Sequence, residues 1–229
     1  MVRTLVRNTL RVVVCLAATT HVLAAWEELE PLPTGPRSSL GVATVDGKIY
    51  VFGGIADIGD PNTLHEYDPE DDAWRRKADM LATAFAGGVA ALGGKIYAVG
   101  IKDGVAVHAY DPATDTWRRR ADLPSPRFGL ECVTAGGKLY AIGGGPWGVE
   151  APLDEYDPED GTWTSKRSAP HQLWGFGAAV VDGRIFVTGG ARLPGASPNA
   201  RGIASALVYD PASDEWERLA DMPVERERH

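Results

Sequence analysis

One segment recurs four times along this chain and limits the folds open to it. Its first copy begins with GKIYVFGG (Gly47–Gly54) and ends with HEYDPEDDAW (His65–Trp74). In every copy a tyrosine precedes a tryptophan by seven residues, and successive tryptophans are 43, 46 and 53 residues apart. Self-similarity at such a period indicates an array of units, none of which buries its hydrophobic face alone. The pairs are Tyr67 with Trp74, Tyr110 with Trp117, Tyr156 with Trp163, and Tyr209 with Trp216.

Each unit is predicted to form four short strands. In the first unit, Ser38–Val45 is small and apolar, and Asp46-Gly47 then matches a type I′ hairpin turn, which needs positive φ at both central residues. The apolar run Lys48–Phe52 fits a strand covered on both faces. No segment has a convincing helical period, so the sequence predicts an all-β fold. The corresponding turns are Gly93-Gly94, Gly136-Gly137 and Asp182-Gly183.

A glycine pair follows the apolar strand and allows a sharp turn or a close approach by a neighbour. It is Gly53-Gly54 in the first unit; its equivalents are Gly100, Gly143, Gly144, Gly189 and Gly190. This pair, followed by Tyr and Trp at a fixed separation, resembles the kelch repeat over about 190 residues. The resemblance implies a β-propeller of four-stranded blades, with the eight repeat aromatics packed between blades. Repeats are expected at approximately 38–80, 85–123, 128–169 and 174–222, within a propeller domain at 26–229.

The number of blades is left open by the sequence. The segment from Trp26 to Pro33 matches the last strand of a repeat, so we expect four complete blades plus one extra N-terminal outer strand. Kelch propellers commonly have six or seven blades, more than this chain supplies. The alternatives are a truncated product, a closed four-bladed ring with a spare strand, or a ring completed by two chains. An incomplete ring would expose a blade face and favour self-association.

Residues 1–25 are predicted to be a signal peptide. Three arginines and no acid are followed there by the predominantly apolar run Val12–Ala25, which is too short to span a bilayer. We therefore expect a secreted or periplasmic protein with no membrane span in the mature chain; the alternative is a cytoplasmic protein with an irregular tail. The remaining chain carries 20 basic and 31 acidic residues, which argues against nucleic-acid binding.

Ligand binding is expected on the face formed by the loops after the second and fourth strands, which differ most between repeats. Arg37 and Arg127 occupy the same repeat position; they could grip a carboxylate, or each could hydrogen-bond to a neighbouring loop. Trp147 and Trp174 could stack on a sugar or anchor a peptide, or pack locally. The long loop Ala191–Ser205 is expected to be a flexible surface excursion. The ligand-binding candidates are Arg37, Arg127, Trp147, His171, Trp174, Arg192 and Arg201.

The sequence predicts no catalytic residue, cofactor or metal site. His65 and His108 hold equivalent positions one repeat apart and should not converge on one ion. Cys132 is expected to be buried, and lone acids such as Glu131 carry no readable signal. We expect a non-catalytic protein that binds a protein or a glycan; the alternatives are an exported kelch enzyme similar to sialic-acid mutarotases, or a propeller fragment. A copper-radical sugar oxidase would need a Tyr–Cys pair with histidine ligands, and none is evident.

Overall fold

The computed structural model describes residues 27–55, 60–82, 87–101, 103–145, 151–192 and 201–226. Strands and turns make up this part of the chain, and it contains no helix. A helix with the length and hydropathy to cross a membrane is therefore absent from these residues. The predicted signal peptide and the candidate Trp147 lie outside the described residues.

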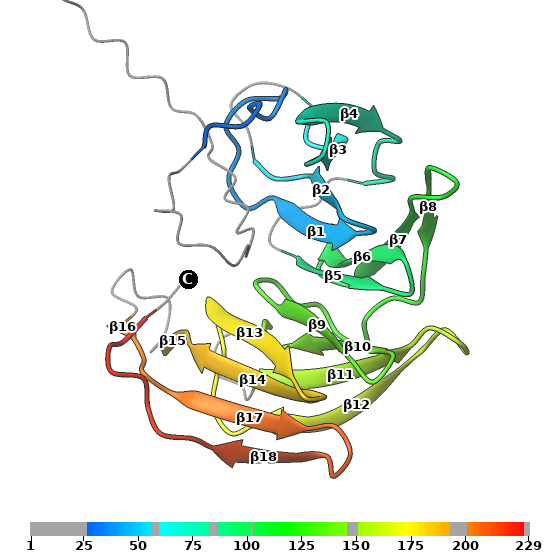
Figure 1. Ribbon diagram of the computed structural model, residues 1–229. Coiled ribbons are helices and arrows are strands. Elements are labelled where there is room, and N and C mark those ends of the chain that lie inside the picture. Colours follow the sequence, from blue (N-terminus) through cyan, green and yellow to red (C-terminus); the bar gives the residue numbers. More distant parts are fainter. Residues whose placement is uncertain are drawn as a thin grey trace, which may run out of the picture.

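Four antiparallel sheets, each of four strands in sequential order, follow one another along the chain (Figure 1). Blade 1 contains β1 (Gly41–Val45), β2 (Lys48–Phe52), β3 (Leu64–Asp68) and β4 (Ala73–Lys77). Blade 2 contains β5 (Gly88–Leu92), β6 (Lys95–Ile101), β7 (Ala106–Asp111) and β8 (Thr116–Arg119). Blade 3 contains β9 (Glu131–Ala135), β10 (Lys138–Ile142), β11 (Ala151–Asp157) and β12 (Thr162–Ala169). Blade 4 contains β13 (Phe176–Val181), β14 (Arg184–Gly189), β17 (Ala206–Asp210) and β18 (Glu215–Arg218).

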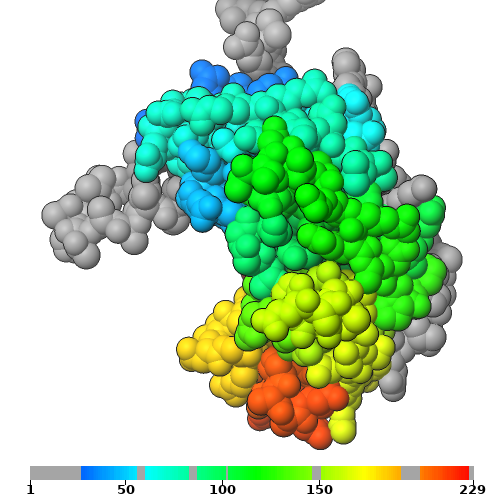
Figure 2. All heavy atoms as spheres, turned by 90° about the vertical axis from the view of Figure 1, so that its right-hand side faces the viewer, coloured from blue at the N-terminus to red at the C-terminus, as the bar shows by residue number. Residues whose placement is uncertain are grey.

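The first strand of each blade is the innermost. Strand β1 contacts β5, β5 contacts β9, and β9 contacts β13, so the blades turn about a common centre. Figure 2 shows neighbouring blades packed in chain order, from cyan through green to orange. The predicted all-β propeller of four-stranded blades is confirmed.

The hairpin turns between the first and second strands have the predicted conformation. Asp46 and Gly47 have φ values of 49° and 74°, as a type I′ turn requires. Positive φ values also occur at Gly93, Gly94, Gly136, Gly137, Asp182 and Gly183. Local turn chemistry thus fixes the register of the two inner strands in all four blades.

Repeat aromatics fill the spaces between blades. Tyr110 packs on Tyr50 of the preceding blade with a ring-centroid distance of 5.9 Å, and Trp117 packs edge-on against Phe52 at 5.5 Å. The same contact joins Tyr156 to Tyr97 and Tyr209 to Tyr140. The four repeat tyrosines, Tyr67, Tyr110, Tyr156 and Tyr209, are at most 2% exposed. The hydrophobic core is therefore divided into layers, one for each blade-to-blade junction.

A set of hydrogen bonds, here called the inter-blade clasp, joins the end of one blade's outer strand to the next blade. The indole Nε1 of Trp117 donates to the main-chain oxygen of Ala78 at 2.9 Å. The carboxylate of Asp115 accepts the main-chain N–H of Ala78 at 2.8 Å and the hydroxyl of Tyr110 at 2.7 Å. Asp115 has a φ of 52°, a left-handed conformation that Asp tolerates better than most residues. In blade 4 the same groups of Trp216, Asp214 and Tyr209 hold Arg167.

The segment before blade 1 takes the place of a preceding outer strand. Trp74 donates to the main-chain oxygen of Glu30 at 2.8 Å, and Asp72 accepts the N–H of Glu30 at 3.0 Å. Residues 27–33 make these contacts without forming a strand, which differs from the predicted extra outer strand. The reason is that, among the described residues, no third strand lies beside this segment to form a ladder with it.

Blade 3 has an incomplete clasp. Trp163 donates to the main-chain oxygen of Ala121 at 2.9 Å, as in the other blades. Gly161, with a φ of 74°, stands where the other blades have aspartate. Within the described residues, the hydroxyl of Tyr156 and the N–H of Ala121 therefore lack the carboxylate that joins their counterparts.

Candidate functional site

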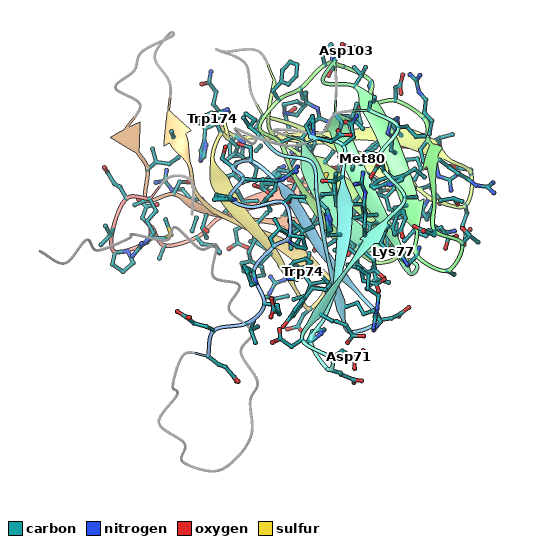
Figure 3. The ribbon with its side chains drawn as sticks, turned by 90° about the horizontal axis from the view of Figure 1, so that it is seen from above. Asp71, Trp74, Lys77, Met80, Asp103 and Trp174 are labelled. Atoms are coloured by element: carbon teal, nitrogen blue, oxygen red, sulfur yellow. The ribbon has the colours of Figure 1, made fainter. Side chains whose placement is uncertain are left out.

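The loops after the second and fourth strands lie on one side of the propeller, here called the loop face. Figure 3 shows Trp174 and Asp103, from two such loops, toward one side and Asp71, from a turn between third and fourth strands, on the opposite side. The near-identical turns thus lie opposite the loops that differ between repeats, as the alternating strand directions require.

Arg37 is held by Thr34 of its own segment and by the loop between β2 and β3. Its Nε donates to the hydroxyl of Thr34, Nη1 to the main-chain oxygen of Gly53, and Nη2 to the main-chain oxygen of Asp60, each at 3.0 Å. The side chain is half-buried. All three nitrogens of the guanidinium therefore already have acceptors within the fold.

Arg127 is completely buried. Its Nη1 lies 3.2 Å from the main-chain oxygen of Gly143 and 3.1 Å from that of Pro152, and its Nη2 donates to Asp154 at 2.5 Å. Desolvation lowers the pKa of Arg127, and the charge of Asp154 opposes this effect. The second carboxylate oxygen of Asp154 accepts the hydroxyl of Ser165 at 2.7 Å.

The two arginines share one structural purpose. Each donates to the main-chain oxygen of the first residue of a glycine pair, Gly53 or Gly143, which explains their common repeat position. We therefore replace the interpretation of Arg37 and Arg127 as carboxylate-gripping residues with the alternative, hydrogen bonding to neighbouring loops. Sequence spacing could not separate the two interpretations because the acceptors are main-chain atoms.

Trp174 and His171 join loops of blades 3 and 4. A Cβ atom at Gly129 would lie 2.7 Å from Nε1 of Trp174, so the indole ring packs directly over that glycine. Nδ1 of His171 lies 2.9 Å from the main-chain oxygen of Gln172, and its Nε2 lies 2.8 Å from the hydroxyl of Ser205. Both ring nitrogens of His171 are thus engaged within the fold, whereas Trp174 is half-buried on the loop face.

The ends of the long loop are paired. Strand β15 (Ala191–Arg192) pairs with β16 (Arg201–Gly202), and Arg192 lies directly opposite Arg201 in the register. The interpretation of 191–205 as a flexible excursion is therefore wrong for its two ends. The main-chain N–H of Ala191 donates to the oxygen of Trp174 at 2.9 Å, which fixes the start of the ribbon beside that loop.

Glu131 is a residue whose environment the sequence did not reveal. It begins the inner strand β9, and its register partner Ile142 directly precedes a glycine pair. The equivalent positions of the other inner strands are Gly41, Gly88 and Gly177. A Cβ at Gly88 would lie 2.6 Å from Sγ of Cys132 in the next blade, so Gly88 has little room for a side chain, whereas the side chain of Glu131 is exposed. An alignment of the four repeats on their hairpin turns would have shown that Glu131 occupies a position at which the other three repeats have glycine.

The environment of Glu131 changes its acidity. Solvent still reaches the side chain, but the surrounding blades desolvate its carboxyl group and raise its pKa. No hydrogen bond or ion pair to its carboxylate is found among the described residues. Burial also raises the pKa of the adjacent Cys132 thiol, which is buried as predicted. Desolvation thus disfavours the charged form of the Glu131 carboxyl group.

Comparison with known proteins fits this architecture. A model of the kelch motif matches residues 36–81 and 175–223, which contain blades 1 and 4. A solved structure described as "Structure of YjhT" superposes with a TM-score of 0.76 over 91% of this chain and 78% of that chain, at 17% identity. The chain is a kelch-repeat β-propeller.

This kelch propeller also resembles three proteins named N-acetylneuraminate epimerase. The one from Pasteurella multocida (strain Pm70) is 39% identical over 82 residues, 33% of this chain and 22% of the relative. That from Shigella sonnei (strain Ss046) is 33% identical over 81 residues, 33% of this chain and 22% of the relative. That from Haemophilus influenzae (strain PittEE) is 32% identical over 83 residues, 34% of this chain and 22% of the relative. The propeller thus matches about a fifth of the length of each relative.

Proposed function

We propose that the loop face of this kelch propeller binds a sugar acid, and that Glu131 transfers protons as the isomers of that acid interconvert. The observation that carries the proposal is the carboxyl group of Glu131, which stands exposed at an inner-strand position occupied by glycine in the other blades and has a raised pKa. The relatives named N-acetylneuraminate epimerase supply the substrate class.

Anomer exchange of a cyclic sugar acid requires a group that both gives and takes a proton. The protonated carboxyl of Glu131 would donate to the ring oxygen as its bond to the anomeric carbon breaks, while the anomeric hydroxyl loses its proton to water. Reclosure on the opposite face of the carbonyl reverses both transfers, so the enzyme ends unchanged. A carboxyl group whose pKa is shifted upward toward the operating pH is the most effective donor for such a step.

A second candidate function, binding a protein partner without catalysis, is favoured by the apolar residues of the loop face. Large hydrophobic side chains are exposed on loops after second or fourth strands around the propeller, and such residues often anchor protein partners. They are Ile55 at 56%, Leu81 at 59%, Phe128 at 48% and Val224 at 59% exposure.

NMR exchange spectroscopy of N-acetylneuraminate with the purified chain tests the first proposal. We expect anomer exchange to be faster with the protein than in buffer alone. The variant Glu131→Gln should reduce the enzymatic rate at least about 100-fold while still binding N-acetylneuraminate. Asp182→Asn is the matched control, because this exposed acid lies in a turn on the opposite side. An exchange rate equal to that of buffer would refute catalysis and leave the binding function, which Phe128→Ser should then weaken.

A further inference from the structure

Carboxylates bind the tyrosine hydroxyls where blade 1 meets blade 2. The rings of Tyr50 and Tyr110 pack together there at a centroid distance of 5.9 Å. Glu66 accepts the hydroxyl of Tyr50 at 2.8 Å, and Asp115 accepts that of Tyr110 at 2.7 Å. A lysine adds a positive charge, since Nζ of Lys77 lies 3.6 Å from the carboxylate of Glu66.

The junction between blades 3 and 4 repeats this arrangement. Glu155 accepts the hydroxyl of Tyr140 at 2.6 Å, and Nζ of Lys166 lies 3.4 Å from the same carboxylate. Asp214 accepts the hydroxyl of Tyr209 at 2.7 Å. Each of these two junctions therefore combines a pair of carboxylates with a lysine and two tyrosine hydroxyls.

Both carboxylates are replaced at the junction between blades 2 and 3. Ala109 is the register partner of Tyr97, a place that glutamate takes in blades 1 and 3. Gly161 stands where the clasps of the other blades have aspartate. A Cβ at Gly161 would lie 3.8 Å from the hydroxyl of Tyr156, so the described residues leave room for a carboxyl group beside that hydroxyl.

The positive charge of this junction is retained. Arg120 follows its repeat tryptophan by three residues, as Lys77 and Lys166 do. Its Nε is buried and has no hydrogen-bond partner among the described residues. Desolvation raises the pKa of Tyr156 and the charge of Arg120 opposes this rise, so the guanidinium acts on that hydroxyl.

The nearest acids do not compensate Arg120. The carboxylate of Asp160 accepts the N–H and the hydroxyl of Thr162 at 3.0 Å and 2.7 Å. The carboxylate of Asp157 is paired with Lys138. In the part of the chain that the structure describes, Arg120 forms no ion pair with either of them. A positive charge and several hydrogen-bond donors therefore share this junction without an acceptor side chain.

We propose that a small carboxylate such as acetate binds between blades 2 and 3, beside Gly161, where the other clasps have an aspartate. The guanidinium of Arg120 is its charge partner, and the hydroxyl of Tyr156 and the N–H of Ala121 donate to it. The hydroxyl of Tyr97 offers a further donor. Charge-assisted hydrogen bonds of this kind are about twice as strong as neutral ones, and a partly buried cation without a partner is unfavourable.

The site is open to solvent and separate from the loop face. Gly161 is half-buried, and the equivalent carboxylate of Asp115 is exposed, so an anion can reach this position. Gly161 lies in a turn between third and fourth strands. Asp71, from the same turn of blade 1, lies on the side opposite the loop face in Figure 3. Carboxylate binding at this junction therefore does not depend on the proposed proton transfer by Glu131.

Thermal unfolding of the full chain in sodium acetate and in sodium chloride of equal ionic strength tests the site. We expect acetate at about 100 mM to raise the melting temperature by at least about 2 °C relative to chloride. Arg120→Gln should lose this difference because the charge partner is gone, and Gly161→Asp because its own carboxylate takes the place of the anion. Arg184→Gln, which removes an exposed arginine of β14, is the control and should keep it.

Acetate also stabilises proteins in general by its effect on the solvent, and such an effect would be equal in all four proteins. An equal rise in the original protein and in the variants would therefore overturn the site. In chloride, Arg120→Gln should melt no lower than the original protein, because it removes a charge without a partner. This variant carries the test if Gly161→Asp does not fold.

Saturation-transfer NMR of the acetate methyl protons measures binding without reference to stability. The original protein should give a signal that formate displaces, and Gly161→Asp and Arg120→Gln should give none. The same signal from the original protein and from both variants would overturn the site. Displacement by sulfate as effective as that by formate would overturn its assignment to a carboxylate.

Discussion

The indole Nε1 of Trp117 donates to the main-chain oxygen of Ala78, 39 residues earlier and 2.9 Å away, and so joins blade 2 to the end of blade 1. The carboxylate of Asp115 completes this junction by accepting the N–H of the same alanine. Ala78, which directly follows the outer strand β4, is therefore held through both of its main-chain polar groups. Propeller stability consequently depends on hydrogen bonds between blades as well as on the apolar layers.

Restoring the missing carboxylate of blade 3 should stabilise the protein. In Gly161→Asp the new carboxylate can accept the hydroxyl of Tyr156 and the N–H of Ala121, as Asp115 does for its counterparts. We expect the free energy of unfolding to rise by about 1 kcal/mol and the melting temperature by about 2–4 °C. Calorimetry measures the change. Gly161→Ala is the control: it has the strain of positive φ without the carboxylate, and it should melt lower than the original protein.

The clasps should fail at low pH. The hydroxyl of Tyr67 and the N–H of Glu30 lower the pKa of Asp72, and the N–H of Arg167 and the hydroxyl of Tyr209 lower that of Asp214. Carboxyl groups with a lower pKa in the folded state add stability that is complete above the unfolded pKa of about 4 and is lost as pH falls through the folded pKa.

Urea unfolding between pH 6 and pH 2 tests this dependence on Asp72 and Asp214. We expect the free energy of unfolding to fall steadily below about pH 4. The double variant Asp72→Asn/Asp214→Asn should start lower at pH 6 and fall less steeply. Parallel curves for the two proteins would show that these carboxylates do not set the acid sensitivity.

Removing Arg127 should destabilise the fold strongly rather than only weaken the binding of a ligand. Arg127→Ala leaves the carboxylate of Asp154 buried without its cation, which costs about 3–5 kcal/mol. Arg37→Ala should cost only about 1–2 kcal/mol, because that side chain is half-buried. Urea titration distinguishes the two, and Arg127→Ala/Asp154→Ala should recover part of the loss. A well-folded Arg127→Ala protein with impaired binding would contradict this structural role.

Glu131 should reduce stability at neutral pH. The surrounding blades desolvate its carboxyl group and raise its pKa in the folded state, so the charged form is penalised and stability declines as pH rises above the unfolded pKa of about 4.3. Glu131→Gln should therefore melt at a higher temperature than the original protein at pH 7, and the two should converge near pH 4. Thermal unfolding at both pH values measures this difference. A variant that melts lower at pH 7 would indicate an unrecognised favourable contact of the carboxylate.

The parts of the fold that the sequence predicted are those set by local chemistry. Asp46-Gly47 and its counterparts can adopt positive φ at both positions, and this property alone fixed the inner hairpins. The seven-residue spacing of Tyr67 and Trp74 likewise recurs in every repeat, because both side chains take part in the same kind of junction between blades.

The candidate site could not be predicted as well, because its residues are defined by distant partners. Arg127 lies among main-chain oxygens up to 25 residues away, and such acceptors leave no pattern in the sequence. The importance of Glu131 depends on register, since only alignment of the inner strands sets it against glycines. The pairing of Arg192 with Arg201 depends on the register of β15 with β16, which the sequence spacing does not set.

The absent carboxylate at Gly161 has a mechanical consequence. Where the structure describes the clasps, the other junctions combine an indole hydrogen bond with a carboxylate bridge, whereas blade 3 holds Ala121 through the indole bond of Trp163. When the two ends of the propeller are pulled apart, the junction between blades that has the fewest hydrogen bonds should separate first. The propeller should therefore extend in two steps. Blades 2 and 3 separate first, and the contacts between blades 1 and 2 and between blades 3 and 4 break afterwards.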